Sequence, residues 1–302
     1  MKPLKLVVLI VLVPFLSFGW NSNGHSTCGA VAYYYLKANS PATIKKVTDI
    51  LEKHPWYTTE WAKRLKGLKG ESRDVALFML ASTFPDEARS TIFKDKSYDS
   101  WHYINYPFHP GKPEGKLAVQ PTPNAENKLI SLLAIIGKEP DAKDIPLDLC
   151  WIFHLTEDLH QPLHSTAMFD ENHPKGDQGG NLVLFKIVAD SPATKLHSFW
   201  DALMTGSFTT TPAKAKKIFG MKEYKESALE ELKQNTTITE WVQKESYPQA
   251  IKYAYLDGKM NGYQDHPNLA PAGYKEKSAK IAERRVVLAG IRLGKFLKDS
   301  LK

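Results

Sequence analysis

The stretch HLTEDLHQPLH, residues 154–164, carries the strongest indication of fold and chemistry in this sequence. His154 and Asp158 stand four residues apart, so a helix would place both side chains on one face. His164 follows Pro162, at which the helix should bend or end. A single His–Asp pair of this kind most often forms an ordinary hydrogen bond on a surface helix, so a metal site needs further ligands.

Further candidate ligands occur on both sides of this stretch. They are His197 and Asp201 in KLHSFWDALM (195–204), His102 in WHYINYP (101–107) and Asp86 in STFPDEAR (82–89). His197 and Asp201 repeat the spacing of four residues. Neutral imidazole and carboxylate groups are ligands that Zn²⁺ prefers, and thiols are not required. These segments together predict a zinc centre.

Apolar residues recur at helical spacing along almost the whole chain. The predicted helices cover residues 24–38, 41–51, 72–81, 124–136, 145–160, 195–204 and 275–302. Residues 181–188 follow a Gly-Gly pair and are rich in Val, Leu, Ile and Phe, which predicts one strand of a hairpin. Residues 105–123 contain several prolines and predict an irregular loop. We therefore expect an all-α, mainly helical fold with a small β-hairpin.

The N-terminus has the pattern of a signal peptide. Two lysines precede an apolar stretch over residues 6–18, and Ser17 and Gly19 occupy the −3 and −1 positions of a cleavage site. The stretch is shorter than the roughly 20 residues of a spanning helix; an uncleaved membrane anchor is the alternative. We expect cleavage of residues 1–19, a single domain over residues 20–302, and a secreted or periplasmic protein.

Composition narrows the class of protein and of partner. With 302 residues, 42% hydrophobic and 24% charged, the chain is a globular protein rather than a disordered or multi-span membrane protein. Its net charge of +7 permits a polyanionic partner, and a basic surface without a specific role is the alternative. No exposed apolar rim for membrane docking is evident. We expect no stable membrane association and no obligate protein partner.

Cleavage before Trp20 would create one more ligand. The free amine and the carbonyl oxygen of a first residue can chelate one metal in a five-membered ring, which an internal Trp could not do. His25 would reach the same ion from the start of the first helix. The two cysteines, Cys28 and Cys150, lie one helical turn from candidate ligands. Two alternatives remain for them: a disulfide between the two helices, or two buried free thiols.

Six motifs occur in the order seen in one known family. They are WNSNGH, PDEAR, WHYINYP, HLTEDLHQPLH, GDQGGN and LHSFWD. In these motifs the chain resembles the zinc-dependent single-strand nucleases of the nuclease S1 and nuclease P1 type, whose superfamily includes zinc phospholipase C. The closing segment ERRVVLAGIRLGKFL also resembles the family's last helix. The resemblance implies a mainly helical single domain around three zinc ions, and the few cysteines and short signal peptide indicate a bacterial member.

The resemblance implies a ligand set for each ion. Asp86, His102, His154 and Asp158 would hold one ion, Trp20, His25 and Asp158 a second, and His164, His197 and Asp201 the third. Asp158 would bridge the first two ions. Asp86, Asp158 and Arg89 would act in catalysis. His160 lies outside this set and is interpreted as a supporting or surface residue.

Substrate contacts follow from the same resemblance. Arg89 would bind a phosphate oxygen in the transition state, and an exposed surface charge is the alternative. Tyr103 would stack on a nucleobase, and a buried core Tyr is the alternative. Gly179, Gly180 and Asn181 match the family's Gly-Gly-Asn element, which either supports the metal site or makes a tight turn into the strand.

The resemblance implies a trinuclear-zinc endonuclease and 3′-nucleotidase. It would cleave single-stranded DNA and RNA, and 3′-nucleotides, to 5′-phosphate products. A phospholipase C on the same scaffold is the alternative. Phospholipases of the superfamily have Glu four residues after the last His ligand, where this chain has Asp201, as nucleases do. A zinc-binding protein without catalysis is a third reading, which the complete ligand set disfavours.

Overall fold

The computed structural model describes residues 20–89, 98–112, 117–138 and 143–301. The predicted signal peptide, residues 1–19, lies outside the described residues. Within them, no helix is long and apolar enough to cross a membrane.

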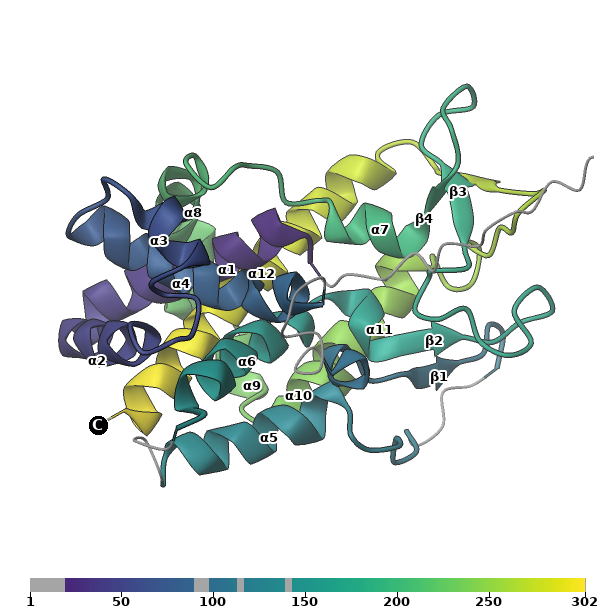
Figure 1. Cartoon of the computed structure of the whole chain (residues 1–302). Coiled ribbons are helices and arrows are strands. Elements are labelled where there is room, and N and C mark those ends of the chain that lie inside the picture. Colours follow the sequence, from purple (N-terminus) through teal and green to yellow (C-terminus); the bar gives the residue numbers. More distant parts are fainter. Residues whose placement is uncertain (1–19, 90–97, 113–116, 139–142, 302) are drawn as a thin grey trace, which may run out of the picture.

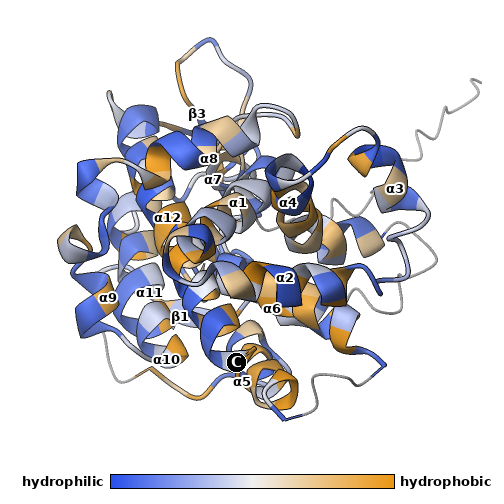
Figure 2. Cartoon of the chain, turned by 90° about the vertical axis from the view of Figure 1, so that its left-hand side faces the viewer, coloured by the Kyte–Doolittle hydropathy of each residue, from blue (hydrophilic) through white to orange (hydrophobic). Residues whose placement is uncertain are grey.

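The described chain is mainly helical, as the sequence predicted (Figure 1). The longer helices are α1 (Ser22–Asn39), α2 (Pro41–Leu51), α4 (Glu71–Ala88), α5 (Ala125–Ile136), α6 (Ile145–Asp158), α8 (Thr211–Phe219) and α12 (Tyr274–Ser300). The shorter ones are α3 (Glu60–Leu65), α7 (Leu196–Asp201), α9 (Glu231–Gln234), α10 (Ile238–Glu240) and α11 (Tyr247–Gln249). Figure 2 shows many apolar residues of α4, α6 and α12 toward the middle of the bundle, with polar residues at its rim. Apolar burial of this kind is the main stabilising contribution to the fold.

Helix α1 runs through the middle of the helical bundle. Every residue from Gly24 to Leu36 is buried, and α4, α8 and α12 all pack against it. Two glycines permit the close approach of its neighbours. A Cβ on Gly29 would lie 2.7 Å from the Phe78 carbonyl oxygen of α4, and one on Gly290 of α12 would lie 2.8 Å from the Cys28 carbonyl oxygen. This packing sets the position of α1 and of His25 near its start.

Most predicted helices are confirmed, with differences at several of their ends. Helix α4 continues past the predicted end at residue 81, through Pro85 and on to Ala88. Helix α6 ends at Asp158, and α7 covers only Leu196–Asp201 of the predicted 195–204. A short 3₁₀ turn, Pro162–Ser165, follows α6 and carries His164. The extension of α4 matters most, because it places the candidate ligand Asp86 in the last turn of that helix.

The β-structure is small and lies at one end of the bundle (Figure 1). The predicted strand is β3 (Leu184–Lys186), which pairs antiparallel with β4 (Thr194–Lys195) and so confirms the hairpin. The sequence did not predict β5 (Asn268–Leu269), which pairs parallel with β3. It also did not predict β1 (Tyr106–Phe108), which lies in the expected irregular loop and pairs parallel with β2 (Thr166–Met168). The β1–β2 pair fixes the segment after His102 beside the segment after His164.

The two cysteines are free and buried. Cys28 lies on α1 and Cys150 on α6, and neither side chain is exposed. Of the two open alternatives, the structure has two buried thiols and no disulfide between them. Burial raises the pKa of both thiols well above the usual value.

Candidate metal centre

The predicted side-chain ligands converge from five parts of the chain. They fall into three groups whose ligand atoms lie within 4.8 Å of one another: His25, Asp86 and His154; His102, His154 and Asp158; and His164, His197 and Asp201. We call His25, Asp86, His102, His154 and Asp158 the inner group, and His164, His197 and Asp201 the outer group. Helices α1, α4 and α6 carry four of the inner residues, and the short α7 carries two of the outer ones.

Asp158 lies at the centre of the arrangement. Its Oδ2 is 3.2 Å from both His102 Nδ1 and His154 Nε2. Its Oδ1 is 3.6 Å from His25 Nε2 and 3.4 Å from His164 Nδ1. One oxygen of this carboxylate therefore faces His102 and His154 and the other faces His25, as the predicted bridge between the first two ions requires.

Asp86 faces the inner imidazoles from the opposite side. Its oxygens lie 3.7 Å from His25 Nε2, His102 Nδ1 and His154 Nε2. The sequence prediction paired His25 with Asp158, whereas the structure places His25 Nε2 almost equally close to Asp86 and Asp158. The division of these ligands between two ions stays a prediction.

Four imidazoles are oriented from behind by hydrogen bonds at Nδ1. His154 donates to the Ser82 carbonyl at 2.8 Å, His164 to the His102 carbonyl at 2.6 Å, and His197 to the Gly179 carbonyl at 2.6 Å. His25 instead faces the Glu157 carboxylate at 2.6 Å. A carbonyl only accepts, so Nδ1 carries the proton and Nε2 keeps its lone pair for a metal.

Several inward-facing atoms are suited to bind a cation. Within the described residues, His25 Nε2, His164 Nε2, Asp86 Oδ1 and Asp158 Oδ1 are buried and make no hydrogen bond. Buried polar atoms without partners are costly and rare. Imidazole nitrogens and carboxylate oxygens gathered at these distances form a donor set that suits Zn²⁺.

The ionisation of the centre is strongly perturbed. Burial opposes ionisation of Asp158, but the surrounding His154, His164 and His102 outweigh it and hold its pKa well below the usual range. Burial raises the pKa of Asp201 and of Glu157 well above the usual range. Burial and the neighbouring His154 lower the pKa of His25. Asp158 is thus the carboxylate most firmly held as an anion.

Trp20 lies beside the inner group and is fully buried. Its indole Nε1 donates to the Glu157 carbonyl at 3.1 Å, and the next residue, Asn21, donates its backbone N–H to the Asp201 carbonyl at 3.1 Å. These bonds fix the start of the described chain between the C-terminal ends of α6 and α7. Chelation by the Trp20 amine and carbonyl stays a prediction.

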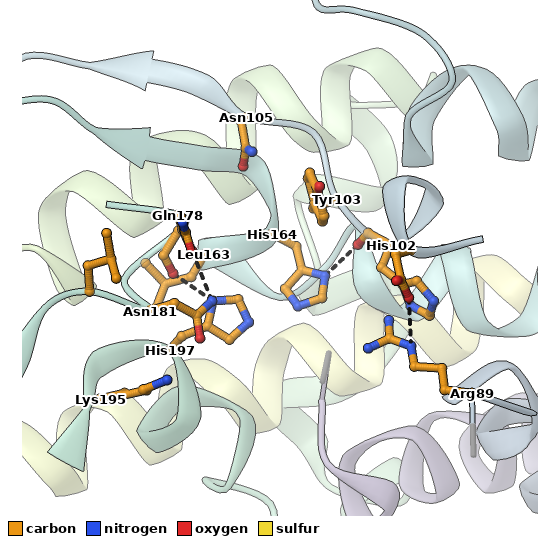
Figure 3. A pocket seen from close by; sticks show the side chains of 13 residues that line it. Arg89, His102, Tyr103, Asn105, Leu163, His164, Gln178, Asn181, Lys195 and His197 are labelled. Carbon is orange, nitrogen blue, oxygen red and sulfur yellow. Dashed lines mark hydrogen bonds and ion pairs between the residues drawn. The ribbon is translucent and has the colours of Figure 1, made fainter. Parts of the chain in front are cut away.

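A cavity of about 450 Å³ opens onto the ligands. His102, His164 and His197 lie along it, with Tyr103 and Arg89 beside them (Figure 3). The Tyr103 side chain is 42% exposed, so the alternative of a buried core Tyr is wrong. Arg89 is 6% exposed, with Nε 3.4 Å from Asp99 Oδ1 and Nη2 3.6 Å from Asp86 Oδ1, so the alternative of an exposed surface charge is wrong.

The Gly-Gly-Asn element borders the same cavity. Gly179 and Asn181 line it, and the two glycines have φ of +63° and +85°, a region that favours glycine. A Cβ on Gly179 would lie 2.6 Å from the Leu163 carbonyl oxygen. The element therefore makes a tight turn, and its Gly179 carbonyl accepts from His197 Nδ1. Support of a metal site stays a prediction.

A family model for S1/P1 nuclease matches residues 20–302. The chain belongs to the S1/P1 nuclease family. No curated protein matches the chain. Membership makes it a nuclease-type phosphodiester hydrolase acting on nucleic acids. S1/P1 nucleases depend on zinc in general, and three His/Asp groups of this chain could hold metal ions.

Three supporting residues of this S1/P1 nuclease were missed by the sequence analysis. Glu157 contacts His25 and Ser82, and Gln161 Nε2 donates to Asp201 Oδ1 at 2.8 Å. Asp177 is buried and accepts from the Met168 and Gly180 backbone N–H groups and from the Tyr255 hydroxyl. The sequence offered one indication of these residues, which is that each is polar and lies within a quoted motif. Exposed residues have the same property, so it did not distinguish them.

His160 supports the centre from inside the protein. It is fully buried, which excludes the surface alternative. Its Nδ1 donates to the Thr156 carbonyl at 2.7 Å, and its Nε2 accepts from Arg292 at 2.7 Å. Arg285 donates to the His160 carbonyl at 3.1 Å, and Glu245 pairs with both arginines. This buried network holds the segment between Asp158 and His164 against α12.

Proposed function

We propose that this S1/P1 nuclease is a secreted or periplasmic, trinuclear-zinc endonuclease and 3′-nucleotidase. Its substrates would be single-stranded DNA and RNA, and its products would have 5′-phosphate ends. Residues 20–302 would form one domain, and residues 1–19 would direct export and be cleaved from the exported protein. One observation carries the proposal. The inner and outer groups meet at Asp158, and the adjoining cavity is lined by the buried guanidinium of Arg89 and the exposed ring of Tyr103.

Each ion would have the ligands predicted from the sequence. The proposed sets are Asp86, His102, His154 and Asp158; Trp20, His25 and Asp158; and His164, His197 and Asp201. When bound, zinc supplies Lewis acidity, which lowers the pKa of a water and neutralises charge on a phosphate. The burial of His25 Nε2, His164 Nε2, Asp86 Oδ1 and Asp158 Oδ1 without a hydrogen bond supports a metal centre formed by these residues.

The chain's own residues would position the substrate. Arg89 would donate hydrogen bonds to phosphate oxygens and stabilise the charge that grows there in the transition state. Asp86 and Asp99 flank its guanidinium and hold it at the cavity wall. The exposed ring of Tyr103 would stack on a base, an interaction of about 1–3 kcal/mol that tolerates any sequence. Stacking of this kind requires an unpaired base, which favours single strands.

One assay set tests the proposal. The purified mature protein, starting at Trp20, would be given single-stranded DNA, RNA, 3′-AMP and phosphatidylcholine, and its metal content would be measured. We expect three zincs per chain, 5′-phosphate products from both nucleic acids, and phosphate release from 3′-AMP. Cleavage of phosphatidylcholine without cleavage of nucleic acid would favour the phospholipase alternative. Inactivity on all four with full zinc content would favour a binding protein. N-terminal sequencing of the exported protein tests cleavage before Trp20.

A further inference from the structure

Glu157 connects three parts of the inner group. Its side chain is fully buried. One carboxylate oxygen is 2.6 Å from His25 Nδ1 on α1, and the other accepts from the Ser82 hydroxyl on α4 at 2.7 Å. Its backbone carbonyl accepts the Trp20 indole N–H at 3.1 Å. A single residue of α6 therefore contacts a candidate ligand, the helix of another ligand and the start of the described chain.

The partner of His25 differs in kind from those of the other oriented imidazoles. His154, His164 and His197 face backbone carbonyls, which are neutral and which no substitution removes. His25 faces a carboxylate. A carboxylate behind a metal-bound imidazole orients the ring and raises its basicity, and losing it typically weakens metal binding by about 10- to 100-fold.

Ser82 links this carboxylate to a second ligand. Its hydroxyl donates to Glu157, while its backbone carbonyl accepts from His154 Nδ1. Residues that orient His25 and His154 from behind are thus joined to one another. The rings of these two histidines are stacked with centroids 4.0 Å apart, so a rotation of the His25 ring would meet His154.

We propose that Glu157 is the positioning residue for the ion that His25 holds, so that this one ion depends on a removable side chain behind its imidazole. The inference rests on the proposed zinc centre. Glu157 directs His25 Nε2 toward Asp158 and Asp86 and fixes the Trp20 indole beside them. It contacts no substrate and no reacting atom. Loss of this carboxyl group, which holds the His25 ring in place, should therefore weaken one ion selectively.

The test measures zinc affinity in a double-mutant cycle of the mature chain. Glu157→Gln keeps the shape of the side chain but replaces one of the two carboxyl oxygens, which face His25 and Ser82, with an amide NH₂. We expect it to weaken the first-released zinc by about 10- to 100-fold in chelator competition, with two zincs retained at wild-type affinity. His25→Ala should bind two zincs, and adding Glu157→Gln to it should cause no further loss. Equal effects of Glu157→Gln with and without His25 would overturn the proposal, as would wild-type affinity for all three ions in Glu157→Gln.

Asp177→Asn is a matched control. Asp177 is equally buried and accepts three hydrogen bonds, but it supports the Gly180 turn beside the outer group. Any effect of Asp177→Asn should persist in full when His25 is Ala. If Glu157→Gln fails to fold by circular dichroism, Ser82→Ala serves instead, because it removes one hydrogen bond to Glu157 and leaves the Ser82 carbonyl in place. Ser82→Ala should weaken the same ion less, and an unchanged affinity would overturn the proposal. A wild-type protein without zinc would instead refute the proposed function.

Discussion

The inner and outer groups are built in different ways. Four residues of the inner group stand on α1, α4 and α6, helices of 18, 18 and 14 residues that pack against one another in the core, and the fifth, His102, ends a 3₁₀ helix of four residues. The outer group stands on a 3₁₀ turn of four residues and on α7, which has six. Its His197 depends on a two-glycine turn, and its Asp201 depends on Gln161. Packing between long helices positions most of the inner group, and hydrogen bonds to short turns position the outer group.

The difference indicates a division of roles. Packed helices hold ligands rigidly and exclude water, which suits ions that must keep a fixed spacing. Turns and loops often present ligands to a substrate, and His164 and His197 line the cavity together with His102 of the inner group. Asp158 belongs to the inner group but also contacts His164, so it joins the two. Substitutions of Asp158, of each group and of the cavity wall should therefore differ in the size and the kind of their effects on zinc content and activity.

The largest effect on zinc content and activity is expected at Asp158, which contacts both groups. Asp158→Ala should lose at least one zinc and nearly all activity, because it removes the carboxylate that faces four imidazoles at 3.2–3.6 Å. Metal analysis and nuclease assays check this. Asp170→Ala is the control, since Asp170 pairs with His173 outside the three groups and should keep three zincs. Three zincs and wild-type turnover in Asp158→Ala would exclude a bridging role.

The next effect concerns the inner group alone. A mature protein with one additional Met before Trp20 has a peptide nitrogen where the free amine would be. It should fold, bind about two zincs per chain and cleave single-stranded DNA far more slowly. Zinc content and rate are compared with those of the protein that starts at Trp20. Full activity of the extended form would remove Trp20 from the proposed ligand set and leave the inner group to side chains.

Zinc binding by the outer group should be sensitive to substitution of Gly179. Gly179→Ala places a Cβ 2.6 Å from the Leu163 carbonyl oxygen at a φ of +63°, which should displace the carbonyl that orients His197. We expect the loss of one zinc and at least a tenfold fall in kcat/KM, with the inner zincs retained. Gly67→Ala is the control, because Gly67 also has positive φ, +82°, but has nothing within 4 Å. A Gly179→Ala protein with three tight zincs would show that the turn is not needed to position His197.

The smallest of these effects is expected at the cavity wall. Arg89→Ala should leave three zincs in place and lower kcat by about 10- to 100-fold with a smaller change in KM, because the side chain would act on transition-state charge. Arg89→Lys keeps the charge but loses the planar donor geometry, so it should recover part of the rate. Steady-state kinetics on a single-stranded oligonucleotide separate the two parameters. An unchanged kcat in Arg89→Ala would limit Arg89 to holding Asp86 and Asp99.

The sequence predicted what depends on local periodicity and missed what depends on distant pairing. Helix α2 was predicted to the residue, because Ser40 and Pro41 mark its start and its apolar face is regular. Strands β1 and β2 are three residues each and lie 60 residues apart in the register Tyr106↔Thr166. Segments this short have no period of their own to detect. Helix α4 was predicted too short because Pro85 usually ends a helix.

The candidate ligands were predictable because their residue types and spacing are rare together. The residues behind them were not. Glu157 occupies a helix position between His154 and Asp158, where a glutamate is ordinarily exposed, and only the packing of α1 and α4 against α6 buries it. Gln161 and Asp177 likewise gain their roles from contacts with Asp201 and Gly180 that folding creates.

The two buried thiols can be used to detect the separation of helices α1 and α6. Cys28 and Cys150 sit on α1 and α6, one turn from His25 and His154, and burial disfavours the reactive thiolate form of both. A thiol-labelling reagent should therefore leave the native protein unmodified and modify both residues once these helices separate. The labelling rate measures how often the helices that carry most of the inner group come apart, and the measurement needs no substrate.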